Sequence, residues 1–165
     1  MDAASASRPL RVDLQVATDD GELPKGADWS RWAGAALNVA SPANGLATRL
    51  TVRIVGNEES RQLNKTYRQQ NAATNVLAFP GSDQNELLAV DERELGDLVI
   101  CLPIARLEAQ QQGKQTLAHM AHLVVHGTLH LIGYDHEDDV TAGQMEELET
   151  KIMRRLGFPD PYSGS

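Results

Sequence analysis

Residues 98–132, with the sequence LVICLPIARLEAQQQGKQTLAHMAHLVVHGTLHLI, begin with an apolar run and continue with two helical patterns. The uninterrupted run of five apolar residues at its start is typical of a strand covered on both faces. A proline and a glycine then delimit a predicted helix over 103–112, and Gly133 ends a longer helix predicted over 116–132. A buried strand followed by two helices indicates a layered domain that contains both kinds of element.

The rest of the chain adds patterns of both periods, with Asp28 and Asn57 as expected helix N-caps. The predicted strands cover 12–16, 50–55, 75–79 and 98–102, and the additional helices cover 28–40, 57–69 and 140–156. These about four strands and five helices predict a single α+β domain over residues 10–160, with a mixed sheet.

Length and composition exclude several classes of protein. A chain of 165 residues is expected to form one domain. Its single cysteine, Cys101, excludes an internal disulfide framework and favours a reducing, cytoplasmic compartment. No run approaches 18 apolar residues, so no membrane span is expected. Residues 1–9 lack the apolar segment of a signal peptide and are predicted to be a disordered extension, while 161–165 are predicted to be a flexible tail.

Charge is unevenly distributed along the chain. The 15 basic and 23 acidic residues give a net charge of −8, which argues against a broad electrostatic grip on a nucleic acid. Only 7 residues are aromatic, which leaves little for a base-stacking platform. Residues 1–80 carry a net +1 and residues 81–165 a net −9. Local contact with a phosphate is therefore compatible with the first half of the chain.

The long predicted helix carries four of the five histidines, at positions 119, 122, 126 and 130, within about an 80° sector of one face. His126 and His130 are four residues apart, so their side chains lie one turn apart and can converge on one ion. We expect His119 and His122 to support the site rather than to bind the ion. His136 follows the helix-ending Gly133, where a chain reversal would bring it back as a third ligand.

The ligand spacing H-x-x-x-H-x-x-G-x-x-H is that of the metzincin zinc proteases. Three imidazoles with one open position are typical of catalytic zinc, because structural sites usually have a fourth protein ligand. The spacing therefore predicts one Zn²⁺ per chain, held by His126, His130 and His136, so that the zinc site lies on the long helix and the loop after it. A metalloprotease is one hypothesis that shares this pattern.

Gly127 occupies the position where zincin proteases have the glutamate that acts as general base. Residues 116–132 contain no aspartate or glutamate that could replace it, which disfavours peptide hydrolysis. A glycine inside a helix costs about 0.8–1 kcal/mol relative to alanine. We interpret Gly127 as a residue that allows close approach beside the first ligand rather than as a packing requirement.

A second chemical feature is the basic helix over 57–69. Arg61, Lys65 and Arg68 share one face, and residues 49–68 together carry a net charge of +3. Such a face is most often only solvated. Beside a hydrolytic zinc, however, arginines would suit a phosphate substrate, because guanidinium binds phosphate through two parallel hydrogen bonds.

The segment 126–136, HGTLHLIGYDH, resembles the HGxLHLxGYDH signature of the YbeY family, metal-dependent endoribonucleases of bacterial ribosomal RNA maturation. The likeness covers about residues 46–160 and includes LNKTYR at 63–68, TNVLAFP at 74–80 and LGDLVI at 95–100. The resemblance implies a zinc held by the three histidines and a functional arginine at Arg68. Asn75 stands where the family often has an aspartate.

What the resemblance implies is a single-strand-specific endoribonuclease that matures the 3′ end of small-subunit (16S) ribosomal RNA and takes part in ribosome quality control. Arg68 would be catalytic, and Arg61 and Lys65 would bind substrate. The expected partners are single-stranded RNA and the ribosome or ribosome-associated proteins, with neither DNA nor a membrane expected. Two alternatives remain: the zinc metalloprotease, and a non-catalytic ribosome-binding module that zinc stabilises.

Overall fold

The structure, a computed structural model, describes residues 10–19, 21–40, 47–81, 92–134 and 138–162. Within these ranges it contains four strands and five helices, which confirms the predicted α+β architecture. The strands are β1 (Leu10–Val16), β2 (Ala47–Val55), β3 (Val76–Pro80) and β4 (Glu92–Cys101). The helices are α2 (Gly26–Ala40), α3 (Asn57–Arg68), α4 (Leu102–Gln111), α5 (Thr116–Ile132) and α6 (Asp139–Arg155). The predicted extension, 1–9, lies outside the described residues.

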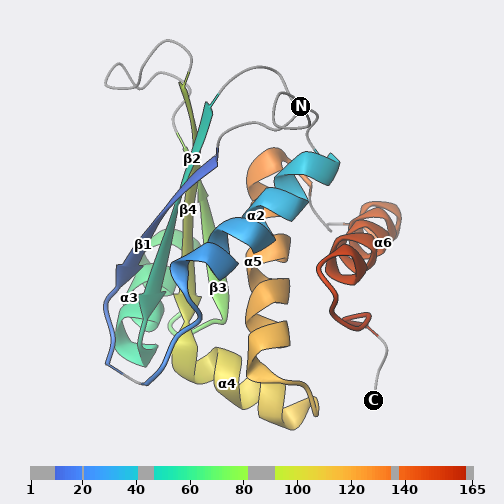
Figure 1. The fold of residues 1–165 in the computed structure, drawn as a ribbon. Coiled ribbons are helices and arrows are strands. Elements are labelled where there is room, and N and C mark those ends of the chain that lie inside the picture. The colour runs from blue at the N-terminus through green and yellow to red at the C-terminus, as the bar shows by residue number, and fades with distance from the viewer. Residues whose placement is uncertain (1–9, 20, 41–46, 82–91, 135–137, 163–165) are drawn as a thin grey trace.

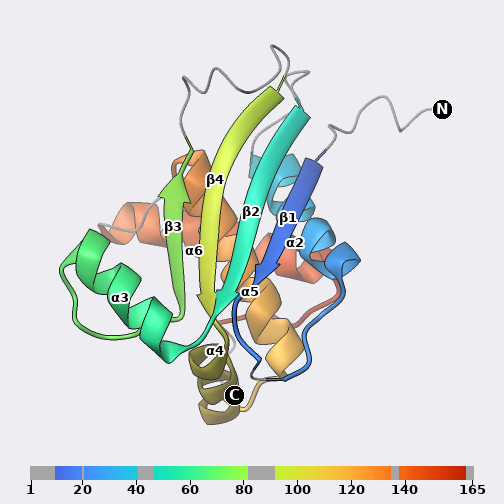
Figure 2. The same cartoon turned by 90° about the vertical axis from the view of Figure 1, so that its left-hand side faces the viewer.

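The four strands form one mixed sheet in the order β1-β2-β4-β3 (Figure 2). Neighbouring strands are parallel except for β3, which runs antiparallel to β4 and lies at an edge. The register of β4 shifts opposite the step from Arg49 to Leu50, next to Gly96. Gly96 has a φ of +143°, and a Cβ there would lie 2.3 Å from the carbonyl oxygen of Phe79. Only glycine fits this bulge, which curves β4 alongside the edge strand.

Helices cover both faces of the sheet, as Figures 1 and 2 show. α2 and α5 pack on one face, α6 packs against α5 beyond them, and α3 lies on the opposite face. Trp29 and Trp32 of α2 are 0% exposed and meet edge to face in the main core, with 5.3 Å between their ring centroids. No described helix has the length and apolar character needed to cross a membrane.

β4 is covered on both faces, because its alternate side chains enter two separate cores. Leu98 and Ile100 pack in the core shared with α2 and α5, whereas Val99 and Cys101 pack toward α3. All four side chains are at most 6% exposed. The prediction of a strand covered on both faces is therefore confirmed for this segment.

Several boundaries differ from those predicted. β4 begins at Glu92 rather than at residue 98, because polar residues there pair through their backbones, which side-chain hydropathy does not reveal. Gly56, not Asn57, is the N-cap of α3, and Asn57 Oδ1 instead accepts from the thiol of Cys101 at 3.4 Å. Asp28 lies in the first turn of α2 rather than at its cap.

The C-terminal segment, predicted as a flexible tail over 161–165, is described as far as Tyr162. Pro161 is buried, and the Tyr162 hydroxyl donates to Glu149 Oε1 at 2.8 Å. Residues 163–165 lie outside the described residues. The chain therefore returns to α5 and α6 after the last helix, which bears on the site described next.

Candidate metal centre and its pocket

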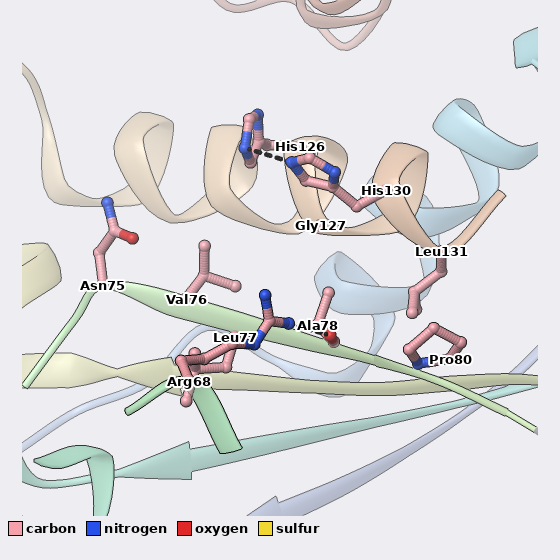
Figure 3. A pocket seen from close by; sticks show the side chains of 10 residues that line it. All are labelled: Arg68, Asn75, Val76, Leu77, Ala78, Pro80, His126, Gly127, His130 and Leu131. Atoms are coloured by element: carbon pink, nitrogen blue, oxygen red, sulfur yellow. Dashed lines mark hydrogen bonds between the residues drawn. The ribbon is translucent and has the colours of Figure 1, made fainter. Parts of the chain in front are cut away.

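α5 and the edge strand β3 enclose a cavity of about 390 Å³ (Figure 3). His126, Gly127, His130 and Leu131 line it from α5, and Arg68 lines it from the end of α3. The remaining lining residues come from β3 and its approach: Asn75, Val76, Leu77, Ala78 and Pro80. The cavity therefore brings together two of the predicted zinc ligands and the predicted catalytic arginine.

His126 and His130 point their ring nitrogens at each other across one helical turn, with 3.1 Å between the two Nε2 atoms (Figure 3). Two nitrogens bound tetrahedrally at about 2.0–2.1 Å from a zinc ion would lie about 3.3 Å apart. The pair therefore fits zinc in both donor type and spacing. His136 lies outside the described residues, among which no group of three or more histidine, cysteine or acidic side chains is positioned to hold a metal.

Glu149 of α6 holds two of the histidines from behind. Its Oε2 lies 2.5 Å from His122 Nε2 and 3.1 Å from His126 Nδ1, and its side chain is 1% exposed. Burial raises the pKa of this carboxyl, but the hydrogen bonds from His122 and His126 outweigh burial and lower the pKa of Glu149 to about 2. An ionised carboxylate only accepts hydrogen bonds, so the His126 Nδ1–H donates and leaves Nε2 with its lone pair toward His130.

His119 is held in a similar way by a different helix. Its side chain is 5% exposed, and its Nε2 lies 2.8 Å from Oε1 of Glu108 on α4. Burial lowers the pKa of His119, although the hydrogen bond to Glu108 opposes this. Glu108 also accepts from Asn75 Nδ2 at 3.0 Å. Neither His119 nor His122 lines the cavity between α5 and β3.

Arg68 reaches the cavity around the free edge of β3. It is the last residue of α3, and its Nη2 donates to the Ala78 carbonyl at 2.9 Å. Its guanidinium carbon lies 6.0 Å from the Phe79 ring centroid. In Figure 3 its guanidinium group lies below the histidine pair, on the opposite side of the cavity. A phosphate between the two sides would meet a cation and the metal ligands together.

The two predicted substrate-binding residues, Arg61 and Lys65, do not line this cavity. Arg61 makes two hydrogen bonds to Glu58, at 3.1 and 2.5 Å, and one to Asn71, and Lys65 is exposed. Of the basic residues that share this face of α3, the structure brings Arg68 to the histidines and places the other two on the outer surface.

Gly127 packs against the sheet, which corrects the interpretation drawn from the sequence. A Cβ at this position would lie 2.6 Å from Cδ2 of Leu98, whose side chain is 0% exposed. Close packing of α5 on β4 therefore accounts for the glycine. The same contact leaves no room for a glutamate next to the first histidine unless Leu98 moves.

Glu149 is the site residue that sequence analysis missed. It belongs to the buried stripe of α6 together with Met145, Ile152 and Met153. A charged residue at an apolar position of an amphipathic helix is a detectable signal, because buried carboxylates are almost always paired. The sequence does not show which residue would be its partner.

Comparison with known proteins identifies the family to which the chain belongs. The family described as Endoribonuclease YbeY matches residues 14–157. A relative from Stutzerimonas stutzeri (strain A1501) named Endoribonuclease YbeY is 49% identical over 93% of this chain and 92% of its own. One of the same name from Pseudomonas entomophila (strain L48) is 47% identical over 93% and 94% of the two chains. The solution structure of TM1509 from Thermotoga maritima has the same fold, with a TM-score of 0.55 and 23% identity over 89% of this chain and 88% of that one.

These findings define the protein as a hydrolase of the endoribonuclease class. The chain belongs to the YbeY family of endoribonucleases. The resemblance noted in the sequence and the enzyme class that it implies are thereby confirmed.

Proposed function

We propose that this protein is a single-strand-specific, zinc-dependent endoribonuclease that cleaves phosphodiester bonds at the cavity between α5 and β3. The observation that carries the proposal is that Arg68 and the histidine pair line one cavity. At about 390 Å³ this cavity falls in the size range of small-ligand sites, so a nucleotide-sized part of a strand can enter it.

Each of the proposed residues has one task. His126 and His130, with His136 from outside the described residues, hold one Zn²⁺, which when bound supplies a Lewis acid and activates water. Arg68 binds the scissile phosphate and stabilises the negative charge that develops on it, from the opposite side of the cavity. Arg61 and Lys65 are left for parts of the RNA outside the cavity, because neither lines it.

The protein's charge supports weak, local contact with RNA. Three of the basic residues at 49–68 pair with acidic side chains: Arg49 with Asp13 and Glu94, Arg53 with Glu59 at 2.6 Å, and Arg61 with Glu58 at 2.5 Å. A fourth, Lys65, lies on the outer surface. The net charge of −8 disfavours a broad electrostatic hold on a phosphate backbone. We therefore propose that the ribosome or ribosome-associated proteins direct it, in the cytoplasm, to the 3′ end of small-subunit ribosomal RNA.

A metalloprotease is the weaker candidate for two structural reasons. Position 127 has no general base and packs against Leu98. The Ala78 carbonyl on the edge strand, which an extended peptide would need as an acceptor, already accepts from Arg68. Both observations favour a phosphodiester over a peptide as the substrate.

The test offers four substrates to the zinc-loaded protein: single-stranded RNA, duplex RNA, single-stranded DNA and casein. We expect internal cleavage of single-stranded RNA, little cleavage of the duplex and none of DNA or casein. Digestion of casein with intact RNA would establish the protease instead. A protein that unfolds on chelation and cleaves none of the four would be the zinc-stabilised binding module.

A further inference from the structure

Glu149 is a fully buried carboxylate with three hydrogen-bond donors around it. Its Oε2 accepts from His122 Nε2 and His126 Nδ1 on α5, and its Oε1 accepts from the Tyr162 hydroxyl on the C-terminal segment. Burial and the neighbouring carboxylate of Glu149 raise the pKa of Tyr162, so its hydroxyl stays a donor. Since buried ions are costly unless paired and hydrogen-bonded, so complete a set of partners indicates that the charge has a specific task.

The contact with His126 determines which nitrogen of that ring faces the cavity as an acceptor. A neutral imidazole carries one proton, and a carboxylate behind Nδ1 keeps the proton there. Nε2 then keeps its lone pair 3.1 Å from His130 Nε2, on the side where a metal would bind. Metal-binding histidines are commonly oriented by a carboxylate in this way, which also makes the ligand nitrogen more basic.

We propose that Glu149 is a positioning residue that holds His126 as the Nδ1–H tautomer and so presents its Nε2 to zinc. The inference deepens the proposed function and rests on it for the identity of the metal. His122 and Tyr162 secure Glu149 in turn, so the C-terminal segment supports the metal centre without reaching it. α6 thereby contributes to metal binding although it provides no ligand in the described part of the chain.

Glu108 provides a matched control within the same molecule. It is also a glutamate on a helix packed against α5, and its Oε1 lies 2.8 Å from the Nε2 of a buried α5 histidine, His119. His119 is not among the predicted ligands. Loss of Glu108 removes a hydrogen bond of His119, whereas loss of Glu149 removes one of His126, a proposed zinc ligand.

The first test uses the unmodified protein without metal. Long-range ¹⁵N–¹H NMR correlations report which nitrogen of each histidine ring carries the proton. We expect a protonated Nδ1 and an unprotonated Nε2 at His126 near neutral pH. A His126 ring protonated at Nε2 instead would overturn the proposal without any variant.

The second test measures zinc affinity by competition with a chromophoric chelator. Glu149→Met removes the charge and both acceptors at similar volume, and an apolar replacement of a buried ionic residue is often tolerated. We expect an affinity about 10–100-fold lower than that of the wild type. Glu149→Gln, which keeps one oxygen acceptor, should lose less, and Glu108→Gln should match the wild type. Thermal unfolding of each metal-free variant identifies any that does not fold.

Three outcomes would contradict the role of Glu149. Glu149→Met could bind zinc as tightly as the wild type, Glu108→Gln could cost as much as Glu149→Met, or the His126 tautomer could persist in Glu149→Met. If Glu149→Met does not fold, the zinc affinity of Glu149→Gln and the His126 tautomer of the wild type still decide whether Glu149 positions His126. A wild type with the expected tautomer that does not bind zinc would contradict the proposed cofactor, and not the Glu149 contact.

Discussion

The two helices that supply the cavity hold their polar side chains in opposite ways. On α5 the histidines are buried or half-buried, and carboxylates from α4 and α6 restrain three of them. On α3 the basic side chains are mostly exposed, and Arg61 pairs within its own helix. A metal centre needs fixed ligand geometry, whereas a substrate-binding side can adapt to its ligand. The predictions below test this division, beginning with the largest expected effect.

His130→Ala removes one of the two facing Nε2 atoms on the rigid side. Because loss of a mere supporting hydrogen bond typically costs 10–100-fold in metal affinity, loss of a ligand should exceed about 100-fold. RNA cleavage should fall to background at the same time. Zinc content by atomic absorption and cleavage of a labelled single strand check this together. A variant that retains stoichiometric zinc would remove His130 from the ligand set.

Arg68→Ala acts on the substrate side alone. Loss of one group that stabilises transition-state charge typically costs about 10²–10³-fold in rate, so kcat/KM for RNA should fall by that factor. Zinc content and thermal unfolding should stay at wild-type values, because Arg68 contacts Ala78 and Phe79 of β3. Arg68→Lys should recover only part of the rate, since lysine cannot bind phosphate through two parallel bonds. Zinc loss in Arg68→Ala would contradict the division of tasks.

Gly127→Ala tests how closely α5 must approach β4. Its Cβ would lie 2.6 Å from Leu98 Cδ2, and overpacking of this kind costs about 1–3 kcal/mol. The gain in helix propensity, about 0.8–1 kcal/mol, offsets part of this cost. We expect a net loss of about 1 kcal/mol in the free energy of unfolding, measured with urea.

Gly143 on α6 is the control for Gly127, because nothing lies within 4 Å of a Cβ placed there. Gly143→Ala should stabilise the protein by up to about 1 kcal/mol through helix propensity alone. Equal effects at the two positions would mean that Leu98 adjusts freely and that packing does not explain Gly127.

Acid should destabilise the metal-free protein in two stages. The pKa of His119 is lowered from 6.5, so below pH 6.5 the unfolded chain binds a proton that the native state excludes, and stability falls. The pKa of Glu149 is lowered from 4.5 to about 2, so its contribution is present above pH 4.5 and is lost as the pH falls toward 2. Urea titrations across this range should show His119→Gln lacking the first stage and Glu149→Gln the second. A first stage that persists in His119→Gln would contradict its assignment.

The smallest effects are expected for Arg61→Ala and Lys65→Ala. Both residues lie outside the cavity, so cleavage should change by no more than about threefold, a difference of less than 1 kcal/mol. The salt dependence of RNA binding should be shallow, with a slope of about −0.7 per phosphate contacted in a single strand. A slope that corresponds to five or more phosphates would show that the outer face of α3 binds RNA after all.

The local part of this structure could be predicted from the sequence. α5 begins and ends at the predicted residues, Thr116 and Ile132, because a long apolar periodicity and Gly133 determine it locally. The pairing of Arg61 with Glu58 three residues away is also local, and the spacing alone could have indicated that Arg61 is engaged.

The long-range part could not be predicted in the same way. The strand order β1-β2-β4-β3 depends on which side chains the helices cover. Glu149 contacts His126, which lies 23 positions earlier in the sequence, and Gly127 of α5 packs against Leu98 of β4. The periodicity of a single helix or strand reveals neither contact. The sequence around Tyr162 resembles a polar tail, and only the structure shows that its hydroxyl donates to Glu149.

The most direct test of the account combines metal content and cleavage in three proteins: wild type, His126→Ala and Arg68→Glu. Each is prepared without metal, loaded with zinc, and assayed on the same single-stranded RNA. The account predicts one zinc and cleavage for the wild type, neither for His126→Ala, and one zinc without cleavage for Arg68→Glu. Cleavage at the wild-type rate by metal-free protein, or by zinc-free His126→Ala, would contradict it.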